Sequence, residues 1–384
     1  MQKFLKVGLL HNTLNVMGGA ERFTLDLIPM LHERCMQVNL ATFDKVRWEA
    51  VRRMFGEVEM PDDQISLLPF RLRLFGIYQR ILMKLLTNKL RRKSDVLVNT
   101  HSDHLFCHSD IVYMHGVTPL DGSGVLERYE SSLLMKLYFM PYKYLIRSKL
   151  KPYTDKDDII FVANSKFTQE RMKRLLKISE SRIIYPAVDT DTYVRLSDKT
   201  ARRDQVVTVG RFTKEKNLQL IPEIASKCAD NINFAIVTAS AGVNNDLMNK
   251  FNEACREYGV ESRVTLHMNI TFRQKLDILG DSKVYLHLMP SEHFGLALAE
   301  ACSAGCLPVV LKGGGPEEIV EGIPDSVCDD FDHAPWLVEL AIRSWSPEKS
   351  KWVSSLMERF SKKNFSDQFC KLIEEVYNRK RRYQ

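Results

Sequence analysis

The sequence lacks the features of secreted, disulfide-bonded or membrane-spanning proteins. Its eight cysteines are scattered over 384 residues, so they form no disulfide framework and favour a reducing, cytosolic setting. No stretch approaches the roughly 18 consecutive apolar residues of a transmembrane helix. The opening residues MQKFLKVGLLHN lack the apolar core and cleavage site of a signal peptide. With 45% hydrophobic and 27% charged residues, we expect a globular protein of the cytoplasm.

The first glycine pair lacks the spacing of a dinucleotide-binding loop. Gly18 and Gly19 follow an apolar run at residues 6–10 and open a stretch with helical periodicity, but the pattern is not G-x-G-x-x-G. Two interpretations stay open. The glycines either let a ligand or acceptor approach the backbone closely, or they only form a tight turn between a strand and a helix.

Acidic residues are absent from two basic stretches in the first half of the chain. Residues 71–93 contain eight basic residues and residues 136–151 contain five, with no Asp or Glu in either. Residues 1–195 carry 30 Lys or Arg and 22 Asp or Glu, which is a net charge of +8, whereas residues 196–384 carry 25 and 26, which is −1. Such a one-sided excess fits an anionic membrane surface or a phosphorylated acceptor.

The first basic stretch has apolar residues at helical spacing and is predicted to be helical. A helix of this kind can lie in a membrane interface, where each basic residue contributes about 1 kcal/mol near anionic lipid. The alternative is an ordinary helix that packs on a sheet and keeps a solvated basic edge. No recognisable nucleic-acid-binding motif accompanies the charge, so we expect no nucleic acid partner.

Two groups of residues have the composition of a metal site. The first group comprises His101, His104, Cys107 and His108, but the carboxylates and the second cluster that would complete a site are not evident. The second group, Asp189-Thr190-Asp191, has an Asp-x-Asp pattern that can hold Mn²⁺ or Mg²⁺, yet its setting fits a turn at a domain boundary. We expect no metal at either group.

Short apolar runs alternate with helical stretches along the whole chain. They lie at residues 6–10, 38–43, 96–99, 111–114 and 159–163, and again at 205–210, 234–238, 264–267, 284–288 and 307–311. The repeated alternation predicts an α/β fold with two doubly wound parallel-sheet domains.

Residues 284–320 form the part around which the chain is organised. They read as a buried strand, a loop with Glu292 and Gly295, a small-residue helix with Glu300, and a second apolar run. The loop leaves the carboxyl end of a strand, where open α/β sheets bind ligands, and the helix start favours an anion. A site that binds a phosphate at the helix start and offers two carboxylates to hydroxyl groups would suit a sugar nucleotide.

Six motifs occur in the order found in one enzyme family. They are Gly18-Gly19-Ala20-Glu21; His115; Ala163-Asn164-Ser165-Lys166-Phe167; Tyr185-Pro186-Ala187-Val188-Asp189; Val209-Gly210-Arg211 with Lys216-Asn217; and Glu292-His293-Phe294-Gly295-Leu296 with Glu300. With these motifs the chain resembles the retaining, nucleotide-sugar-dependent glycosyltransferases of family 4, which have the GT-B fold. Within that family the motifs look most like the branch that extends dolichol-linked oligosaccharides with mannose.

The resemblance implies two Rossmann-like domains that face each other across a cleft. Residues 1–195 would form the acceptor domain and residues 196–364 the donor domain. The C-terminal helix, residues 365–384, would cross back onto the first domain. In this first domain His115 would contact the donor sugar as a catalytic residue, and Gly18 and Gly19 would let the domain approach the diphosphate and the acceptor.

The resemblance also implies roles for residues of the donor domain. Arg211 and Lys216 would hold the donor diphosphate and stabilise its growing negative charge in place of a metal. Glu292 would accept from the donor-sugar hydroxyls, and Glu300 from the ribose hydroxyls of the nucleoside. The remaining substrate-binding residues would be His293, Phe294, Gly295 and Leu296.

The implied activity is retaining transfer of a hexose, mannose as first guess, from GDP-mannose or a UDP-hexose to a lipid-linked glycan. No metal or other cofactor would take part. The protein would associate peripherally with the cytosolic face of a membrane through residues 71–93 and 136–151. The alternatives are a GT-B sugar-nucleotide epimerase, a glycosyltransferase with a soluble or polysaccharide acceptor, and a nucleic-acid-binding protein.

Overall fold

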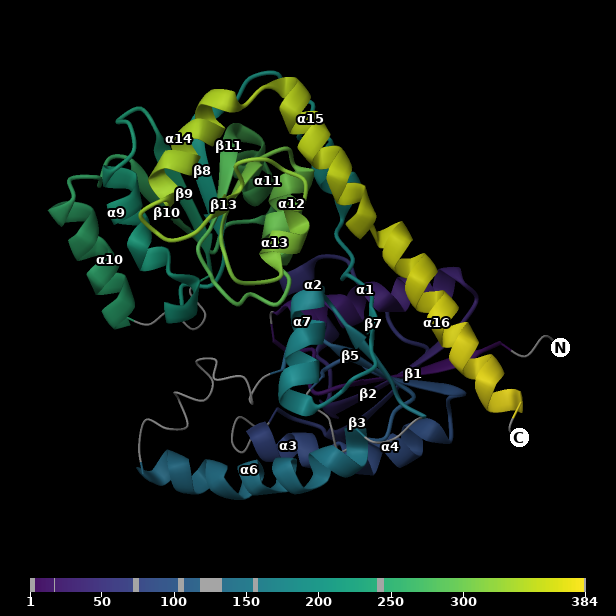
Figure 1. The fold of residues 1–384 in the computed structure, drawn as a ribbon. Coiled ribbons are helices and arrows are strands. Elements are labelled where there is room, and N and C mark those ends of the chain that lie inside the picture. The colour runs from purple at the N-terminus through teal and green to yellow at the C-terminus, as the bar shows by residue number, and fades with distance from the viewer. Residues whose placement is uncertain are drawn as a thin grey trace. The chain divides into compact units, whose positions relative to one another are not determined.

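The computed structural model describes residues 4–16, 18–71, 76–102, 107–117, 133–154, 158–239 and 245–382. The chain divides into two compact units (Figure 1). The first unit contains Met1–Ala187 and Phe365–Gln384, and the second contains Val188–Asn364. Each unit is built on one parallel β-sheet with helices on both faces. The predicted fold class is therefore confirmed.

The first unit ends at Ala187 and not at residue 195, where the sequence placed the boundary. The short helix α8 (Thr190–Val194) packs against α12 (Leu296–Ser303) of the second unit. Tyr193 is buried, with 1% of its surface exposed. Because burial of this large side chain is favourable, it holds the segment to the second unit, although the surrounding sequence is polar.

Seven parallel strands form the first sheet, in the order β3-β2-β1-β4-β5-β6-β7. Their bounds are β1 (Lys6–His11), β2 (Gln37–Asp44), β3 (Asp63–Leu68), β4 (Val96–Asn99), β5 (Ile111–Met114), β6 (Ile160–Ala163) and β7 (Arg182–Ile183). The edge strands β3 and β7 were not predicted, because β3 has no continuous apolar run and β7 is very short. The strand order reverses between β1 and β4, so the carboxyl ends of these two strands flank the switch point at which open α/β sheets bind ligands.

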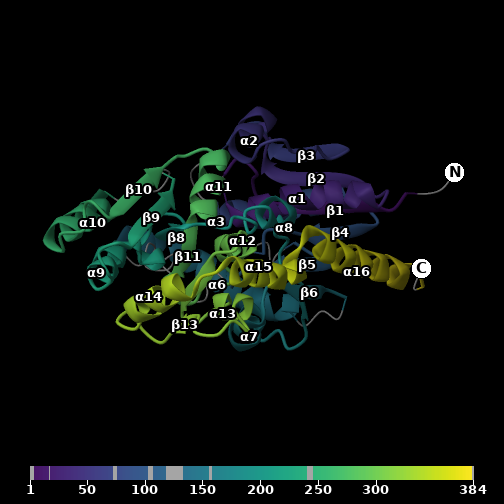
Figure 2. The same cartoon turned by 90° about the horizontal axis from the view of Figure 1, so that it is seen from above.

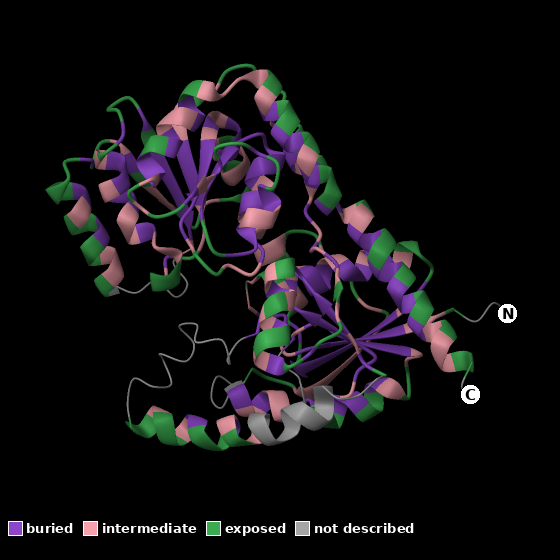
Figure 3. Cartoon of the chain, in the orientation of Figure 1, coloured by how far each residue is buried: buried purple, intermediate pink, exposed green. Residues whose placement is uncertain are grey.

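Helices cover both faces of this sheet. They are α1 (Gly19–Glu33), α2 (Trp48–Phe55), α3 (Gly76–Leu82), α4 (Lys84–Arg91), α6 (Leu133–Thr154), α7 (Lys166–Arg171) and the last part of α16 (Lys362–Arg382). One apolar core lies between the sheet and helices α1 and α16, and another lies under α4. Figure 3 shows the central strands of both sheets as buried and the outer faces of the helices as exposed, whereas the edge strand β3 is only partly buried.

The second sheet has six parallel strands in the order β10-β9-β8-β11-β12-β13. The strands are β8 (Arg203–Val209), β9 (Asn233–Thr238), β10 (Val264–Met268), β11 (Ser282–His287), β12 (Leu307–Leu311) and β13 (Val327–Cys328). Here the order reverses between β8 and β11. As in the first sheet, the carboxyl ends of these two strands flank the expected ligand-binding edge.

The helices of the second unit also lie on both sides of its sheet. They are α8, α9 (Ile221–Ser226), α10 (Asn245–Glu257), α11 (Phe272–Asp281), α12, α13 (Pro316–Ile319), α14 (Ala334–Ser344) and α15 (Pro347–Leu356). Figure 2 shows α9 and α10 beside strands β9 and β10, and α14 contacts α9 as well as β11 and β12. Helix α11 packs on β8, and α12 packs on β11 and β12.

The C-terminal helix belongs to the first unit from Phe365 onward. Phe365 and Phe369 are buried in the core that contains α1, and both contact the ring of Phe23 edge-on. At the far end of α16, the Lys380 ammonium pairs with Asp110 at 3.0 Å. The apolar side of α16 thus completes the core of the first unit, although its sequence is far from the rest of that unit.

The basic stretch at residues 71–93 forms two helices, α3 and α4, which meet at Met83; residues 72–75 lie outside the described part. Helix α6 contains the second basic stretch from residue 136 onward. On one side of α6, Phe139 and Tyr142 pack against Ile77 of α3. No helix in the described part of the chain is both long enough and apolar enough to cross a membrane.

Candidate active site

The loop after β11 is fixed by the glycine-rich turn at residues 313–315. The amide of Gly315 donates to the carbonyl oxygen of Glu292 at 2.8 Å. A side chain at Gly315 would overlap with the carbonyl group of His293, so only glycine permits this close approach. The turn therefore holds the backbone that carries Glu292 against the end of β12.

Gly295 turns the chain from this loop into α12. Its φ of 106° lies in the left-handed region, which glycine adopts without strain. Phe294 just before it is buried and contacts the ring of Phe360 edge-on at 5.3 Å. Leu296 is the first residue of α12. The free NH groups of the first turn consequently lie at the carboxyl edge of the sheet, where they favour an anion.

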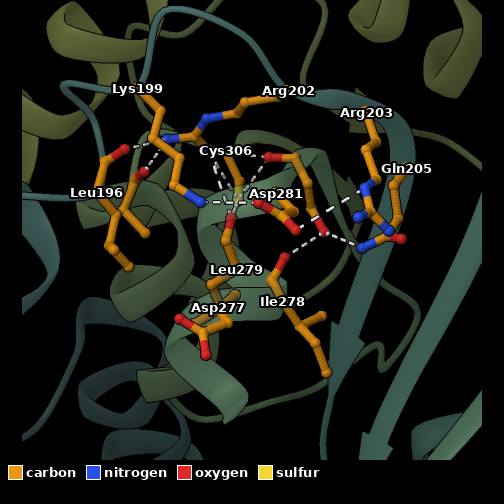
Figure 4. Close-up of polar contacts among 12 residues, drawn as sticks. Leu196, Lys199, Arg202, Arg203, Gln205, Asp277, Ile278, Leu279, Asp281 and Cys306 are labelled. Carbon is orange, nitrogen blue, oxygen red and sulfur yellow. Dashed lines mark hydrogen bonds and ion pairs between the residues drawn. The ribbon is translucent and has the colours of Figure 1, made fainter. Parts of the chain in front are cut away.

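Arg202 fixes the opposite end of α12 (Figure 4). Its guanidinium donates to the carbonyl oxygen of Ala304 after α12, to that of Leu279 in α11 at 3.4 Å, and to that of Leu196 after α8 at 2.8 Å. The same group lies 5.5 Å from the ring of Trp345, within the range of a cation–π contact. One partly buried cation thus satisfies carbonyl groups at the ends of three helices.

Lys216 and Glu292 form an ion pair at the carboxyl ends of β8 and β11. Burial by itself would raise the pKa of the Glu292 carboxyl, but the charge of Lys216 and its hydrogen bond to the carboxylate hold that pKa below the usual value. Nε2 of His287 lies 4.0 Å from the same carboxylate. Burial lowers the pKa of His287 to about 4, so this imidazole is neutral at pH 7.

The loop after β8 positions Lys216 and presents Arg211. Asn217 has a φ of 55°, and its side-chain amide donates to the carbonyl oxygen of Leu288 at 2.9 Å, which ties the loop to the end of β11. Arg211 is exposed, and its guanidinium bonds to no described residue. The loop thus offers one paired cation and one cation that is available to an anionic ligand.

Glu300 of α12 contacts Lys275 of α11, with 2.5 Å between Oε2 and Nζ. The same ammonium donates to the hydroxyl oxygen of Tyr193 at 2.9 Å and lies 5.3 Å from the Tyr193 ring. Lys275 and Tyr193 were missed by the sequence analysis. No sequence signal links them to Glu300, because the three residues come from three different helices.

Several polar atoms at this edge of the sheet are buried without a hydrogen-bond partner among the described residues. They are Nε2 of His287 at the end of β11, Oγ1 of Thr238 at the end of β9, and Oγ1 of Thr213 after β8. A buried polar atom without a partner costs about 1–3 kcal/mol. The three atoms come from adjacent strand ends, which is the arrangement expected where a polar ligand or ordered water completes the site. His287 was recognisable as the one polar side chain inside the apolar run 284–288.

His115 follows β5 in the first unit. Its Nε2 donates to the carbonyl oxygen of Thr100 at 2.9 Å, and its own carbonyl oxygen accepts from Asn164 at 3.0 Å. Since a carbonyl oxygen only accepts, Nε2 carries a hydrogen in this conformation. The rings of Phe23 and Tyr113 contact it edge-on. The predicted hydrogen-bond donor of His115 is therefore already engaged within its own unit.

Gly18 and Gly19 form the start of α1, as predicted. Gly18 packs against the carboxylate of Glu21, which a side chain at this position would have to displace. The Glu21 carboxylate oxygen lies 3.7 Å from Nε2 of His11, at the end of β1. His11, Glu21 and His101 lie close enough together to share a metal ion. Within the described residues, no other group of three His, Cys, Asp or Glu side chains does so.

Among the described residues, neither metal-like group of the sequence comes together as a set of ligands. Cys107 is buried, and burial raises its pKa to about 11, whereas His108 pairs with Asp158 at 3.0 Å. His104 lies outside the described residues. Asp189 starts α8, and its carboxylate pairs with Lys362 at 3.0 Å, in keeping with the expected turn at a unit boundary.

The structure groups the predicted site residues by unit. The second unit brings together Arg211, Lys216 and the loop from Glu292 to Leu296, with Glu300 one helix turn further on. His115, Gly18 and Gly19 belong to the first unit, at the carboxyl edge of its sheet. The second unit thus combines cations, carboxylates and a helix start at a ligand-binding edge.

Comparison with known proteins agrees with this architecture. The crystal structure of Anabaena Alr3699/HepE in complex with UDP superposes with a TM-score of 0.72 at 14% identity, covering 97% of this chain and 100% of that one. The protein has the GT-B fold. Residues 190–323 match the family described as Glycosyl transferases group 1, so the chain contains a glycosyltransferase group 1 domain, and this domain holds the Glu292–Glu300 loop and helix.

Two curated relatives are mannosyltransferases. The GDP-Man:Man(3)GlcNAc(2)-PP-Dol alpha-1,2-mannosyltransferase of Dictyostelium discoideum is 27% identical over 51% of this chain and 42% of its own length. The alpha-1,3/1,6-mannosyltransferase ALG2 of Candida glabrata is 23% identical over 98% of this chain and 91% of its own length. The chain spans less than half the length of the alpha-1,2-mannosyltransferases that it matches.

Proposed function

We propose that the protein is a retaining glycosyltransferase that moves a hexose from a nucleotide sugar to a lipid-linked glycan. The main support for the proposal is the ion pair between Lys216 and Glu292 close to the start of α12. Arg211, which is unpaired among the described residues, adds a second cation. This arrangement supplies cations for a diphosphate and a carboxylate for sugar hydroxyls. The names of both mannosyltransferase relatives support mannose as the first choice of hexose.

The bond to the anomeric carbon breaks as negative charge grows on the leaving diphosphate. Arg211, Lys216 and the NH groups at the start of α12 would stabilise that charge, each donor contributing about 2–4 kcal/mol in a preorganised site. No metal is required at the diphosphate if these groups act together. Glu292 is an ionised carboxylate paired with a cation, which suits hydroxyl binding better than nucleophilic attack.

Retention of configuration follows if the acceptor approaches on the face from which the diphosphate leaves. A phosphate oxygen would then take the proton of the acceptor hydroxyl while the new glycosidic bond forms. Glu300, oriented by Lys275, would accept hydrogen bonds from the ribose hydroxyls. His115 would act on the donor sugar: its Nε2–H would donate a hydrogen bond to the substrate in place of the Thr100 carbonyl.

Peripheral membrane binding is part of the same proposal. Helix α6 exposes large apolar side chains on the side opposite its buried face: Leu133, Leu134, Leu137, Met140 and Tyr144. An apolar helix face with basic residues near it is the pattern of a helix that lies in a membrane interface. A lipid-linked acceptor would be presented at such a surface.

A panel of GDP-, UDP- and ADP-sugars in thermal-shift assays tests the donor directly. We expect one nucleotide sugar to raise the melting temperature, with the shift lost in Glu300→Ala and kept in His115→Ala. His115→Ala should instead lower turnover. The absence of any shift with all three nucleotides would overturn the proposed activity, and equal loss of affinity in both variants would contradict the division of roles.

A further inference from the structure

We propose that His11, Glu21 and His101 bind a divalent transition metal ion of the zinc type in the first unit. The three side chains come from the end of β1, the first turn of α1 and the segment after β4. Because β1 and β4 are adjacent strands at the reversal of the strand order, the cluster occupies the switch point of the first sheet. All three residues belong to the first unit.

The distances between the ligand atoms fit a single ion. Nε2 of His11 lies 3.3 Å from Nδ1 of His101 and 3.7 Å from Oε1 of Glu21. Two ligands about 2.0–2.1 Å from a tetrahedral Zn²⁺ are separated by roughly 3.3–3.4 Å. All three ligand atoms lie within 4.8 Å of one another, so a relative movement of at most about 1.5 Å brings the remaining pair of ligand atoms to the separation found around a single ion.

Threonine hydroxyls set the tautomer of His11. The hydroxyl of Thr24 can donate to the Ala20 carbonyl at 3.0 Å or to the Thr100 hydroxyl oxygen at 2.9 Å, and the hydroxyl of Thr100 donates to the Leu10 carbonyl at 3.2 Å. Both hydroxyl oxygens therefore offer lone pairs to Nδ1 of His11, at 2.9 and 3.0 Å. With its hydrogen on Nδ1, the ring directs the lone pair of Nε2 into the cluster. Metal-binding histidines are oriented in this way by a hydrogen bond from the other ring nitrogen.

The surroundings favour a cation. His11 is fully buried, and Glu21 is 8% exposed. Among the described residues, the ionisable group that pairs with the Glu21 carboxylate is His11. A buried carboxylate is costly unless it is paired or coordinates a metal. His101 is only partly buried, which leaves a route for the ion and room for water as a fourth ligand.

Without metal, the same residues make a weaker network. Nδ1–H of His101 then donates to Nε2 of His11, and the carboxylate of Glu21 has no full counter-charge unless His11 is protonated. Binding of the ion replaces this hydrogen bond by two metal–nitrogen bonds, and the ring hydrogen of His101 moves from Nδ1 to Nε2. The ion would thereby connect β1, α1 and the segment after β4, and would fix the glycine loop at Gly18, which packs on Glu21.

Cobalt substitution provides the test. The metal-free full-length protein is titrated with Zn²⁺ and with Co²⁺, and we expect one equivalent to bind, with the intense visible absorption of tetrahedral Co²⁺. His11→Gln and Glu21→Gln should lower the affinity at least about tenfold, the effect typical even of losing supporting groups at a metal site. His108→Gln, a histidine substitution elsewhere in the same unit, should bind as the unaltered protein does.

The variant His101→Cys keeps the test decisive if the others fold poorly. It retains a zinc ligand, so it should still bind one equivalent, and its Co²⁺ form should gain a sulfur-to-cobalt charge-transfer band. Absence of stoichiometric binding by the unaltered protein would overturn the site. A His101→Cys protein that binds Co²⁺ without the thiolate band would exclude His101 as a ligand.

Discussion

The Lys216 ammonium contacts the Glu292 carboxylate across the carboxyl ends of β8 and β11. The two residues are separated by 76 positions in the sequence, and the strands on which they depend are neighbours in the sheet. The pair has two consequences. It keeps Glu292 ionised, and it places a cation beside the free NH groups of α12, so the diphosphate and the sugar of a donor would be held by adjacent groups.

Substitution of Lys216 should affect the chemical step more than substrate binding. We expect Lys216→Gln to lower kcat by about 10²–10³, because the lost charge acts on a leaving group whose negative charge grows in the transition state. Steady-state kinetics with the donor found in the nucleotide panel would measure this. Lys227→Gln is the control, since Lys227 pairs with Glu223 and Asp332 at the surface. A rise in KM with unchanged kcat would show that Lys216 only binds the ground state.

Substitution of Lys275 should weaken nucleotide binding through Glu300. Lys275→Leu removes the cation that orients the Glu300 carboxylate, and we expect a loss of about 1–2 kcal/mol in affinity for the nucleoside diphosphate. Calorimetric titration of the variant would measure it. Arg273→Gln on the same helix is a matched control, because Arg273 is exposed and pairs only with Asp277 among the described residues. Independent effects of Lys275→Leu and Glu300→Ala in a double-mutant cycle would contradict the coupling.

His287 should make the folded state sensitive to mild acid. Its pKa is about 4 in the folded protein against 6.5 for an ordinary histidine, so the unfolded chain takes up a proton first as the pH falls. The contribution of His287 to the free energy of unfolding is fully present above pH 6.5. It falls by about 3 kcal/mol as the pH is lowered from 6.5 to 4. His287→Leu should lack this component when melting temperatures at pH 7 and pH 5 are compared. His267→Leu, on edge strand β10, is the control; equal pH dependence of His287→Leu and the unaltered protein would refute the assignment.

Donor cleavage should not depend on Mg²⁺ or Mn²⁺. Because Arg211 and Lys216 would stabilise the leaving diphosphate, transfer is expected to continue in EDTA. Activity that is lost in EDTA and restored by Mn²⁺ would instead indicate a metal at the diphosphate. Activity restored by Zn²⁺ alone would point to the His11, Glu21 and His101 cluster, so the two metal questions have separable answers.

Binding to anionic liposomes should depend on the apolar side of α6 and on the basic helices α3 and α4. A variant with Leu134, Leu137 and Met140 changed to Ser should sediment less with vesicles of mixed neutral and anionic lipid, because less apolar area inserts. Charge removal at Lys84 and Lys89 should weaken binding by about 1 kcal/mol for each residue near the surface. Binding unaffected by both sets of changes would remove the membrane role from the proposal.

Much of the fold could be predicted because most of the strands are marked by a local run of apolar residues. Apolar runs such as those at residues 96–99 and 307–311 are long enough to mark buried strands, and the order of the motifs placed Glu292 and Glu300 on a loop and a helix start. Prediction failed where the decisive contact is not local. The edge strand β3 has no apolar run, and α8 joined the second unit through the burial of Tyr193.

By itself, the sequence determined the class of fold, the two parallel sheets and the residue types at the donor-binding edge, since hydrophobic periodicity and motif spacing are properties of the chain. Only the tertiary structure decided which charges meet. Lys275 reaches Glu300 from another helix, and His11, Glu21 and His101 meet because β1 and β4 became neighbours in the sheet. Electrostatic and metal-binding contacts depend on distances of a few ångströms, and those distances are set by packing between elements remote in the sequence.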